Sequence, residues 1–135
     1  MRFKDSVALN GDDEIIWSRV SNVEEIPNYW PAVRSLEFVG GNEKESIAKI
    51  EFAFGGTSKA RIMVDEADRT LLFFYTSGAL TGTQRVSADR ERLMTELDVK
   101  FHGAYRLLSR VESDRLRART NQALKRLVAP EGDGT

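Results

Sequence analysis

Cysteine is absent from this sequence of 135 residues, and histidine occurs only once. Without cysteine the chain has no disulfide framework, no thiolate metal site and no cysteine nucleophile. A single histidine leaves no cluster of ligands for a transition metal. The formal net charge is −1, so the chain as a whole has no electrostatic attraction to nucleic acid. We therefore expect neither a metal nor another cofactor, and no nucleic-acid partner.

Long hydrophobic runs are also absent. No stretch of about 18 apolar residues occurs, which argues against a transmembrane helix and against stable membrane insertion. Residues 1–13 lack the apolar core of a secretory signal peptide, so we expect a soluble, cytoplasmic protein. The hydrophobic content of 41% is ordinary for a globular protein. The length predicts a single domain over residues 1–130, followed by a frayed tail at 131–135.

Positive charge is concentrated near the C-terminus. Residues 103–129 contain seven basic and two acidic side chains, whereas residues 1–66 contain eight basic and twelve acidic ones. One interpretation is a solvated helix face that complements a more acidic body. The other is a phosphate-binding strip. Aromatic side chains between the basic residues would be typical of such a strip, and only Tyr105 is present. The sequence leaves both interpretations open.

The segment 12–31 holds both tryptophans and two of the three prolines. Its pattern predicts two short helices with a break between them. Asp12 or Asn10 is placed to cap the first helix, and Asn22 to cap the second. Helices this short are not stable alone. They must therefore pack against a surface that another part of the chain supplies.

Alternation of apolar and polar residues predicts seven strands. They are expected at residues 3–9, 32–39, 47–54, 59–65, 71–76, 80–88 and 91–101. Short turns join the later strands, which favours an antiparallel meander. A helical segment, 104–128, follows Gly103 and is long enough to cross a small sheet. Its apolar stripe slips partway along, through Ala104, Leu107, Leu108, Val111, Leu116, Leu124, Leu127 and Val128. The fold class is therefore α+β.

Three tight turns predict the register of the later strands. Two-residue turns at 67–68, 77–78 and 89–90 would place Val64 opposite Leu71, Tyr75 opposite Leu80 and Val86 opposite Leu93. Directly opposite residues share a face of the sheet, and a slip of one residue would exchange the faces. All three turns select one apolar inner face: Ile50, Phe52, Phe54, Ala60, Ile62, Val64, Phe73, Tyr75, Val86, Leu93, Leu97, Val99 and Phe101.

Residues 15–33, IIWSRVSNVEEIPNYWPAV, lie between the first strand and a Gly-Gly hairpin and resemble the start of START/Bet v 1-like (SRPBCC, polyketide cyclase-like) domains. The matching positions are Trp17, Val20, Pro27, Trp30, Pro31 and Val33. Residues 78–101 resemble the final hairpin of these domains, and the last helix matches in place and length. The resemblance implies a helix-grip fold: a seven-stranded antiparallel sheet wrapped around a long C-terminal helix, two short helices after the first strand, and a cavity between sheet and helix.

The inner face carries few polar side chains, namely Tyr75, Gln84 and Thr95, and no charged one. Acid–base catalysis needs a titratable group in the site, so we expect no catalytic residue and no metal ligand there. Tyr29 and Trp30 are expected at the mouth of the cavity. The candidate ligand-binding residues are Tyr29, Trp30, Phe52, Phe54, Ile62, Phe73, Tyr75, Gln84, Thr95, Leu97 and Phe101.

An apolar cavity with a few hydrogen-bonding groups predicts binding or transport of a small hydrophobic ligand, either lipid-like, isoprenoid or aromatic. One alternative is a polyketide cyclase/dehydratase-like enzyme in which Tyr75 or Arg34 acts as an acid. Another is a protein-interaction or co-chaperone-type module with a collapsed cavity. Apolar residues on the outer face also predict a possible homodimer. They are Met63, Leu72, Phe74 and Met94.

Overall fold

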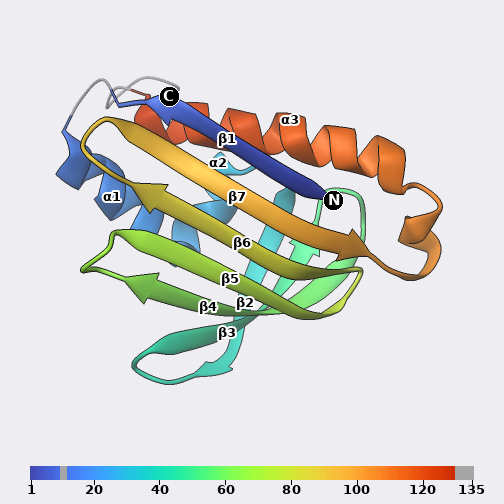
Figure 1. The fold of residues 1–135 in the computed structure, drawn as a ribbon. Coiled ribbons are helices and arrows are strands. Elements are labelled where there is room, and N and C mark those ends of the chain that lie inside the picture. The colour runs from blue at the N-terminus through green and yellow to red at the C-terminus, as the bar shows by residue number, and fades with distance from the viewer. Residues whose placement is uncertain (10–11, 130–135) are drawn as a thin grey trace.

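The computed structural model describes residues 1–9 and 12–129 (Figure 1). The strands are β1 (Arg2–Ala8), β2 (Val33–Gly41), β3 (Glu45–Phe52), β4 (Thr57–Asp65), β5 (Thr70–Gly78), β6 (Leu80–Ala88) and β7 (Arg92–Phe101). The helices are α1 (Asp13–Ser21), α2 (Ile26–Tyr29) and α3 (Ser109–Val128), with 3₁₀ helices η1 (Val23–Glu25) and η2 (Gly103–Arg106). The predicted order of elements is confirmed. The proposed cap Asn10 and the tail 131–135 lie outside the described residues.

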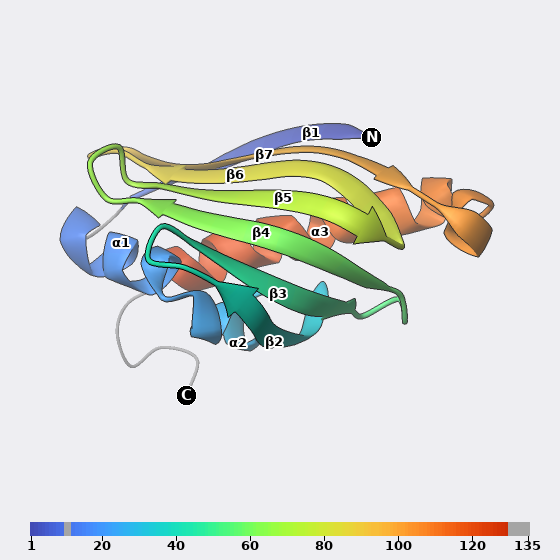
Figure 2. The same ribbon diagram turned by 90° about the horizontal axis from the view of Figure 1, so that it is seen from below.

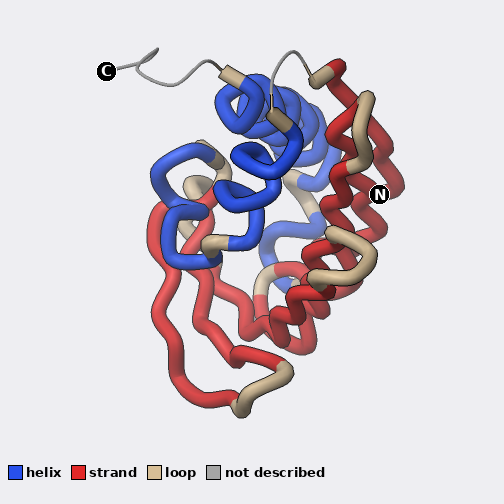
Figure 3. Tube along the Cα trace, turned by 90° about the vertical axis from the view of Figure 1, so that its left-hand side faces the viewer, coloured by secondary structure: helices blue, strands red, loops and turns tan. Residues whose placement is uncertain are grey.

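The seven strands form one antiparallel sheet in the order β1-β7-β6-β5-β4-β3-β2. The sheet curves, and all the helices lie on its concave side (Figure 3). Helix α3 runs along β1 and β7, while α1 and α2 lie nearer one end of the sheet (Figures 1 and 2). This arrangement is the predicted α+β helix-grip architecture. It encloses the inner face of the sheet between strands and helices.

The two short helices, α1 and α2, pack at one end of the sheet. The Asp12 carboxylate accepts a hydrogen bond from the Glu14 N–H at 2.8 Å, so Asp12 caps α1 as expected. The Asn22 side chain makes no cap hydrogen bond, contrary to the prediction. The segment it begins is a 3₁₀ turn, in which the Asn22 carbonyl accepts from the Glu25 N–H at 3.0 Å. The backbone thus closes this turn without the side chain.

Long-range hydrogen bonds fix α1 in place. The Trp17 indole N–H donates to Glu66 Oε2 at 2.7 Å, which ties the helix to the β4–β5 turn. Arg19 Nη1 donates to the Leu127 carbonyl at 2.9 Å, near the end of α3. A cation that binds the last carbonyls of a helix satisfies acceptors without intrahelical partners and complements the helix dipole. Helix α1 is therefore joined to both the sheet and α3.

The predicted register is confirmed for β4 and β5, where Val64 lies opposite Leu71. Between β5 and β6 it is displaced by two residues: Tyr75 lies opposite Gly82 rather than Leu80. The displacement arises because β5 continues to the residue that was expected to complete the turn. An even shift keeps each side chain on its predicted face.

The β6–β7 hairpin is displaced by two residues in the same sense. Val86 lies opposite Thr95 rather than Leu93. The connection is longer than a two-residue turn, because Asp89 Oδ1 accepts from two backbone N–H groups of its own loop, both at 2.7 Å. Such a carboxylate-stabilised loop competes with a two-residue turn. The predicted inner face is again preserved.

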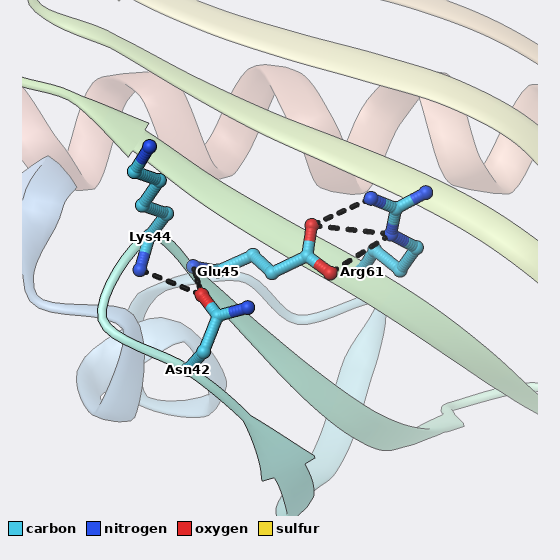
Figure 4. Close-up of polar contacts among 4 residues, drawn as sticks. All are labelled: Asn42, Lys44, Glu45 and Arg61. Carbon is cyan, nitrogen blue, oxygen red and sulfur yellow. Dashed lines mark hydrogen bonds and ion pairs between the residues drawn. The ribbon is translucent and has the colours of Figure 1, made fainter.

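The β2–β3 hairpin is stabilised at its turn and at its flank (Figure 4). Asn42 Oδ1 accepts from the backbone N–H groups of Lys44 at 2.8 Å and Glu45 at 3.1 Å. The Glu45 carboxylate contacts the guanidinium of Arg61 on β4 at 2.6 Å. β2 is one of the two edge strands, and its pairing with β3 is interrupted by two register shifts. The hairpin therefore has a hydrogen-bonded turn, whereas the pairing of its two strands is irregular.

The last helix begins later than predicted. Residues 103–106 form η2, and α3 starts at Ser109. Its buried stripe comprises Glu112, Leu116, Thr120, Ala123, Leu124 and Leu127. The earlier apolar residues Leu107, Leu108 and Val111 are exposed, so the part of the predicted stripe that precedes its slip is not buried. At the slip in the apolar pattern, the apolar side chains change from the solvent-exposed side of the segment to the side that is buried in the core. No helix of the described chain is long and apolar enough to cross a bilayer.

Candidate functional site

The predicted ligand-binding residues come together between the sheet and the helices, in one core with the buried side chains of α1 and α3. Aromatic rings form a continuous row within it. Ring centroids are separated by 6.4 Å for Trp30–Phe73, 5.9 Å for Phe73–Tyr75, 5.9 Å for Tyr75–Phe52, 5.2 Å for Phe52–Phe54 and 5.7 Å for Phe54–Phe101. Rings at these separations are in favourable contact. The row is thus a packed aromatic wall.

A chain of three buried polar side chains crosses this wall. The Tyr75 hydroxyl donates to Gln84 Oε1 at 3.1 Å, and Gln84 Nε2 donates to Thr95 Oγ1 at 3.4 Å. The Thr95 hydroxyl in turn donates to the Arg85 carbonyl at 3.0 Å. Tyr75, Gln84 and Thr95 are each 4% exposed or less. We call these three residues the polar relay. Each donor of the relay is directed at the next acceptor, from Tyr75 through Gln84 to Thr95. This order fixes the orientation of the Gln84 amide.

Burial, together with the nearby Tyr29 phenol, raises the pKa of Tyr75 above its ordinary value. Burial likewise raises the pKa of Tyr29. An apolar environment disfavours the charged phenolate, which explains both shifts. Both side chains are therefore neutral hydrogen-bonding groups at physiological pH. They are not bases, and they supply polarity to the interior without charge.

Gly82 lies directly opposite Tyr75 on the neighbouring strand. Its φ angle is +131°, and a Cβ atom added there would lie 2.1 Å from the Asp98 carbonyl oxygen. Both the backbone conformation and the close approach of β7 therefore require glycine. As a result, the position opposite the Tyr75 ring carries no side chain.

The two residues expected at the cavity mouth differ in exposure. Trp30 is 4% exposed, and its indole N–H donates to Thr120 Oγ1 at 3.2 Å. Tyr29 is only partly buried. Tyr29 thus reaches the surface, whereas Trp30 joins the end of α2 to the middle of α3. The pair connects solvent to the aromatic wall.

Helix α3 adds polar side chains to this core that the strand pattern does not predict. They are Thr120 and Glu112. One Glu112 oxygen accepts from Arg115 Nη1 at 3.2 Å, while the buried Oε2 has no hydrogen-bond partner among residues 1–9 and 12–129. The signal in the sequence is the spacing of four that links Glu112, Leu116, Thr120 and Leu124. An inward carboxylate is therefore present on the helix although the sheet has none.

The single histidine, His102, and the predicted dimer residues are not members of the aromatic wall. His102 is partly buried at the junction after β7, with Nε2 2.6 Å from Thr81 Oγ1. No group of three metal-ligating side chains gathers among the described residues. On the convex face, a hollow of about 680 Å³ includes Leu72 and Phe74. These two, with Met63 and Met94, are partly buried, and a homodimer through them stays a prediction.

No family model matches the sequence, and no curated protein matches it. Solved structures do. The protein TTHA0849 from Thermus thermophilus aligns over 95% of this chain and 94% of its own, with a TM-score of 0.80 and 14% identity. The Zhui aromatase/cyclase from Streptomyces sp. R1128 aligns over 98% of both chains, with a TM-score of 0.71 and 14% identity.

A START superfamily protein from Mycobacterium smegmatis aligns over 93% of this chain and 98% of its own, with a TM-score of 0.67 and 15% identity. Sequence identities this low carry the fold and leave the function open. The agreement extends over nearly the full length of each of the three structures. The chain therefore has the START/Bet v 1-like helix-grip fold that residues 15–33 and 78–101 implied.

Proposed function

We propose that this protein binds a small hydrophobic ligand, lipid-like, isoprenoid or aromatic, between the curved sheet and α3. The observation that carries the proposal is the polar relay set within an aromatic wall. Binding sites for small molecules combine apolar walls with a few placed polar groups. The apolar rings supply affinity, and the relay orients one polar end of the ligand.

The relay also favours a particular polar group. The Tyr75 oxygen uses its proton toward Gln84 and keeps lone pairs that accept hydrogen bonds. The Gln84 amide uses one N–H toward Thr95 and keeps a second. A ligand hydroxyl both donates and accepts, so it satisfies both groups at once. A hydroxylated hydrophobic molecule is thus the best match.

Access to this site requires the aromatic row to open. Its rings contact one another, so a ligand must replace some ring–ring contacts with contacts to itself. Apolar contacts of similar area exchange at small net cost. Gly82 lies opposite Tyr75 and adds no side chain to the wall. Displacement of the rings next to Tyr75 therefore brings the ligand's hydroxyl to the relay without breaking it.

Fluorescence of Trp30 provides the test. Trp17 lies on α1 and bonds to Glu66, so Trp17→Phe isolates the Trp30 signal next to Phe73. We expect saturable changes in emission with 1-naphthol, farnesol or oleic acid as aromatic, isoprenoid and lipid-like probes. If 1-naphthol is the preferred probe, its methyl ether should bind about tenfold more weakly, and Tyr75→Phe should remove that difference.

Native mass spectrometry of protein purified from its own host complements the titration. We expect a bound apolar compound that is released when the protein unfolds. No bound compound, together with unchanged Trp30 emission for all three probes, would overturn the proposal. That outcome would instead favour the protein-interaction module with a closed core.

A cyclase/dehydratase-like enzyme is the second candidate, and Glu112 is the observation that favours it. Its buried Oε2 has no hydrogen-bond partner in the described part of the chain, and Glu112 belongs to the buried stripe of α3. A carboxylate there suits removal of a proton, while the Tyr75 hydroxyl, turned from Gln84 toward the substrate, suits polarisation of a carbonyl. Arg34 is less suited, because it is exposed and bonds to Glu51 at 3.4 Å.

Turnover separates this enzyme from a binding protein. A linear 1,3,5-triketone is a suitable probe, with loss of one water on ring closure followed by mass spectrometry. For an enzyme, we expect Glu112→Gln to abolish ring closure above the uncatalysed rate while ligand binding persists. Asp114→Asn changes an exposed carboxylate two residues away and should have no effect. Equal rates with and without the protein would exclude this second candidate.

A further inference from the structure

An exposed apolar group lies where α3 begins. Leu107 is 91% exposed, Leu108 53% and Val111 50%. The other exposed large apolar side chains in the described chain are Ile15 at 44%, Phe38 at 42% and Val39 at 53%. Leu107 and Leu108 lie in the turn between η2 and α3, and Val111 lies in the first turn of α3, so the three exposed apolar side chains fall within five consecutive residues. We call these three residues the apolar cluster. The η2–α3 turn that carries it projects beyond the end of the sheet (Figures 1 and 2).

A basic hollow lies beside this cluster. It has a volume of about 580 Å³, and its lining includes Lys100, Arg106, Arg110, Asp114 and Arg117. Four of its side chains are cationic and one is a carboxylate. Asp114 contacts Arg117 at 3.9 Å. Within residues 1–9 and 12–129, Lys100, Arg106 and Arg110 form no ion pair, so the hollow keeps a local excess of positive charge.

We propose that the apolar cluster and the basic hollow together dock this protein on an anionic lipid surface. Exposed leucines flanked by arginines are the composition of helices that lie in a membrane interface. The leucines enter the headgroup region, and the cations bind lipid phosphates. Positive side chains near an anionic leaflet strengthen such attachment in proportion to their number.

Charge and chemistry favour a lipid surface over nucleic acid. Binding of single strands requires exposed aromatic side chains for base stacking. Tyr105, the aromatic residue in this region, is partly buried and packs edge-on against Phe54 at 5.1 Å. Aliphatic side chains that are exposed as fully as Leu107 instead suit insertion between lipids. The attachment is peripheral and involves one turn of the chain, in keeping with the absence of a spanning helix among the described residues.

Sedimentation with vesicles tests the proposal directly. We expect binding to phosphatidylcholine vesicles that contain phosphatidylglycerol, little binding to phosphatidylcholine alone, and weakening as salt is raised. Leu107→Ser with Leu108→Ser, and separately Arg106→Gln with Arg110→Gln, should each reduce binding about tenfold or more. All four side chains are exposed, so thermal melting should be unchanged.

Matched variants elsewhere on the surface serve as controls. Phe38→Ser with Val39→Ser removes another exposed apolar pair, and Lys125→Gln with Arg126→Gln removes a basic pair at the far end of α3. Both control proteins should bind anionic vesicles like the parent. Equal losses in the controls, or no binding of the parent protein, would overturn the proposal.

A site-specific label gives a second readout. The chain has no cysteine, so Leu107→Cys accepts a single environment-sensitive dye. Its emission should shift to the blue with anionic vesicles, while the same dye at Phe38→Cys should not respond. The sedimentation result and the dye emission are both independent of whether the interior binds a ligand. A blue shift at both positions, or at neither, would contradict docking through the η2–α3 turn.

Discussion

The indole N–H of Trp30 donates a hydrogen bond to the hydroxyl of Thr120 across 3.2 Å, although the residues are 90 positions apart. Both side chains are buried. The bond joins the segment after α2 to the centre of α3. It also sets the indole against Phe73, the first ring of the aromatic wall. The position of the long helix and the boundary of the candidate site are thus fixed by the same contact.

Replacing Thr120 with valine should destabilise the protein by about 1–3 kcal/mol, because a buried indole donor loses its partner. Valine matches threonine in shape and lacks only the hydroxyl. Urea unfolding measures the stability, and NMR hydrogen exchange of the Trp30 indole proton reports the bond. We expect faster exchange in Thr120→Val and retained protection in Thr120→Ser. Unchanged protection in the valine variant would show that Trp30 has another acceptor.

Replacing Tyr75 with phenylalanine should cost about 1–2 kcal/mol of unfolding free energy, since Gln84 Oε1 loses its donor. Gln84→Leu removes the amide. If the hydroxyl acts through Gln84, the double variant should lose less stability than the sum of the two single variants. Additive losses would mean that the two groups stabilise the core separately. Chemical denaturation of the four proteins completes this cycle.

Substitution of Gly82 with alanine should destabilise the protein by roughly 3 kcal/mol or more, because backbone strain and a clash with the Asp98 carbonyl add together. Gly55 provides the matched control. Its φ angle is +99°, and a Cβ atom there meets nothing within 4 Å. Gly55→Ala should therefore cost only the strain, about 1–2 kcal/mol. Thermal and urea unfolding compare the two. Equal losses would contradict the clash at Gly82.

Stability at alkaline pH should depend on Tyr75. Its pKa is raised above the ordinary value of 10.0, so above about pH 10 the unfolded chain releases a proton that the folded chain retains. The stabilisation is complete below that pH and decreases by about 1.4 kcal/mol per pH unit above it. Tyr75→Phe should lose stability less steeply between about pH 10 and 11. Parallel slopes for the two proteins would contradict a buried, protonated Tyr75.

Face assignment in the sheet was predictable from sequence, whereas register was predicted correctly for the β4–β5 hairpin and wrongly for the β5–β6 and β6–β7 hairpins. The alternation of side chains along each strand places Tyr75, Gln84 and Thr95 on one face of the sheet. An error in register by an even number of residues leaves that face unchanged. The actual contacts depend on those lengths. The two-residue turn predicted at 89–90 would also place Gln84 opposite Thr95, yet Gln84 lies opposite Leu97 and reaches Thr95 diagonally. Which polar groups bond to one another follows from loop hydrogen bonds, such as those of Asp89, that pattern alone does not contain.

The helix shows the opposite limitation. Leu107, Leu108 and Val111 have the spacing of a buried stripe, and only the later stripe is buried. Apolar periodicity identifies a face without saying what covers it. The same ambiguity concealed Glu112, which occupies an inward position between two apolar stripes. A slip in periodicity is therefore informative in itself, because it marks where a helix changes its surroundings.

The irregular edge of β2 has a consequence for self-association. A regular edge strand with exposed Phe38 and Val39 would be a template on which a second chain could add its own strand. The register shifts next to these residues break the row of backbone groups that such an addition needs. We therefore expect the β2 edge to resist edge-to-edge pairing although it is partly apolar.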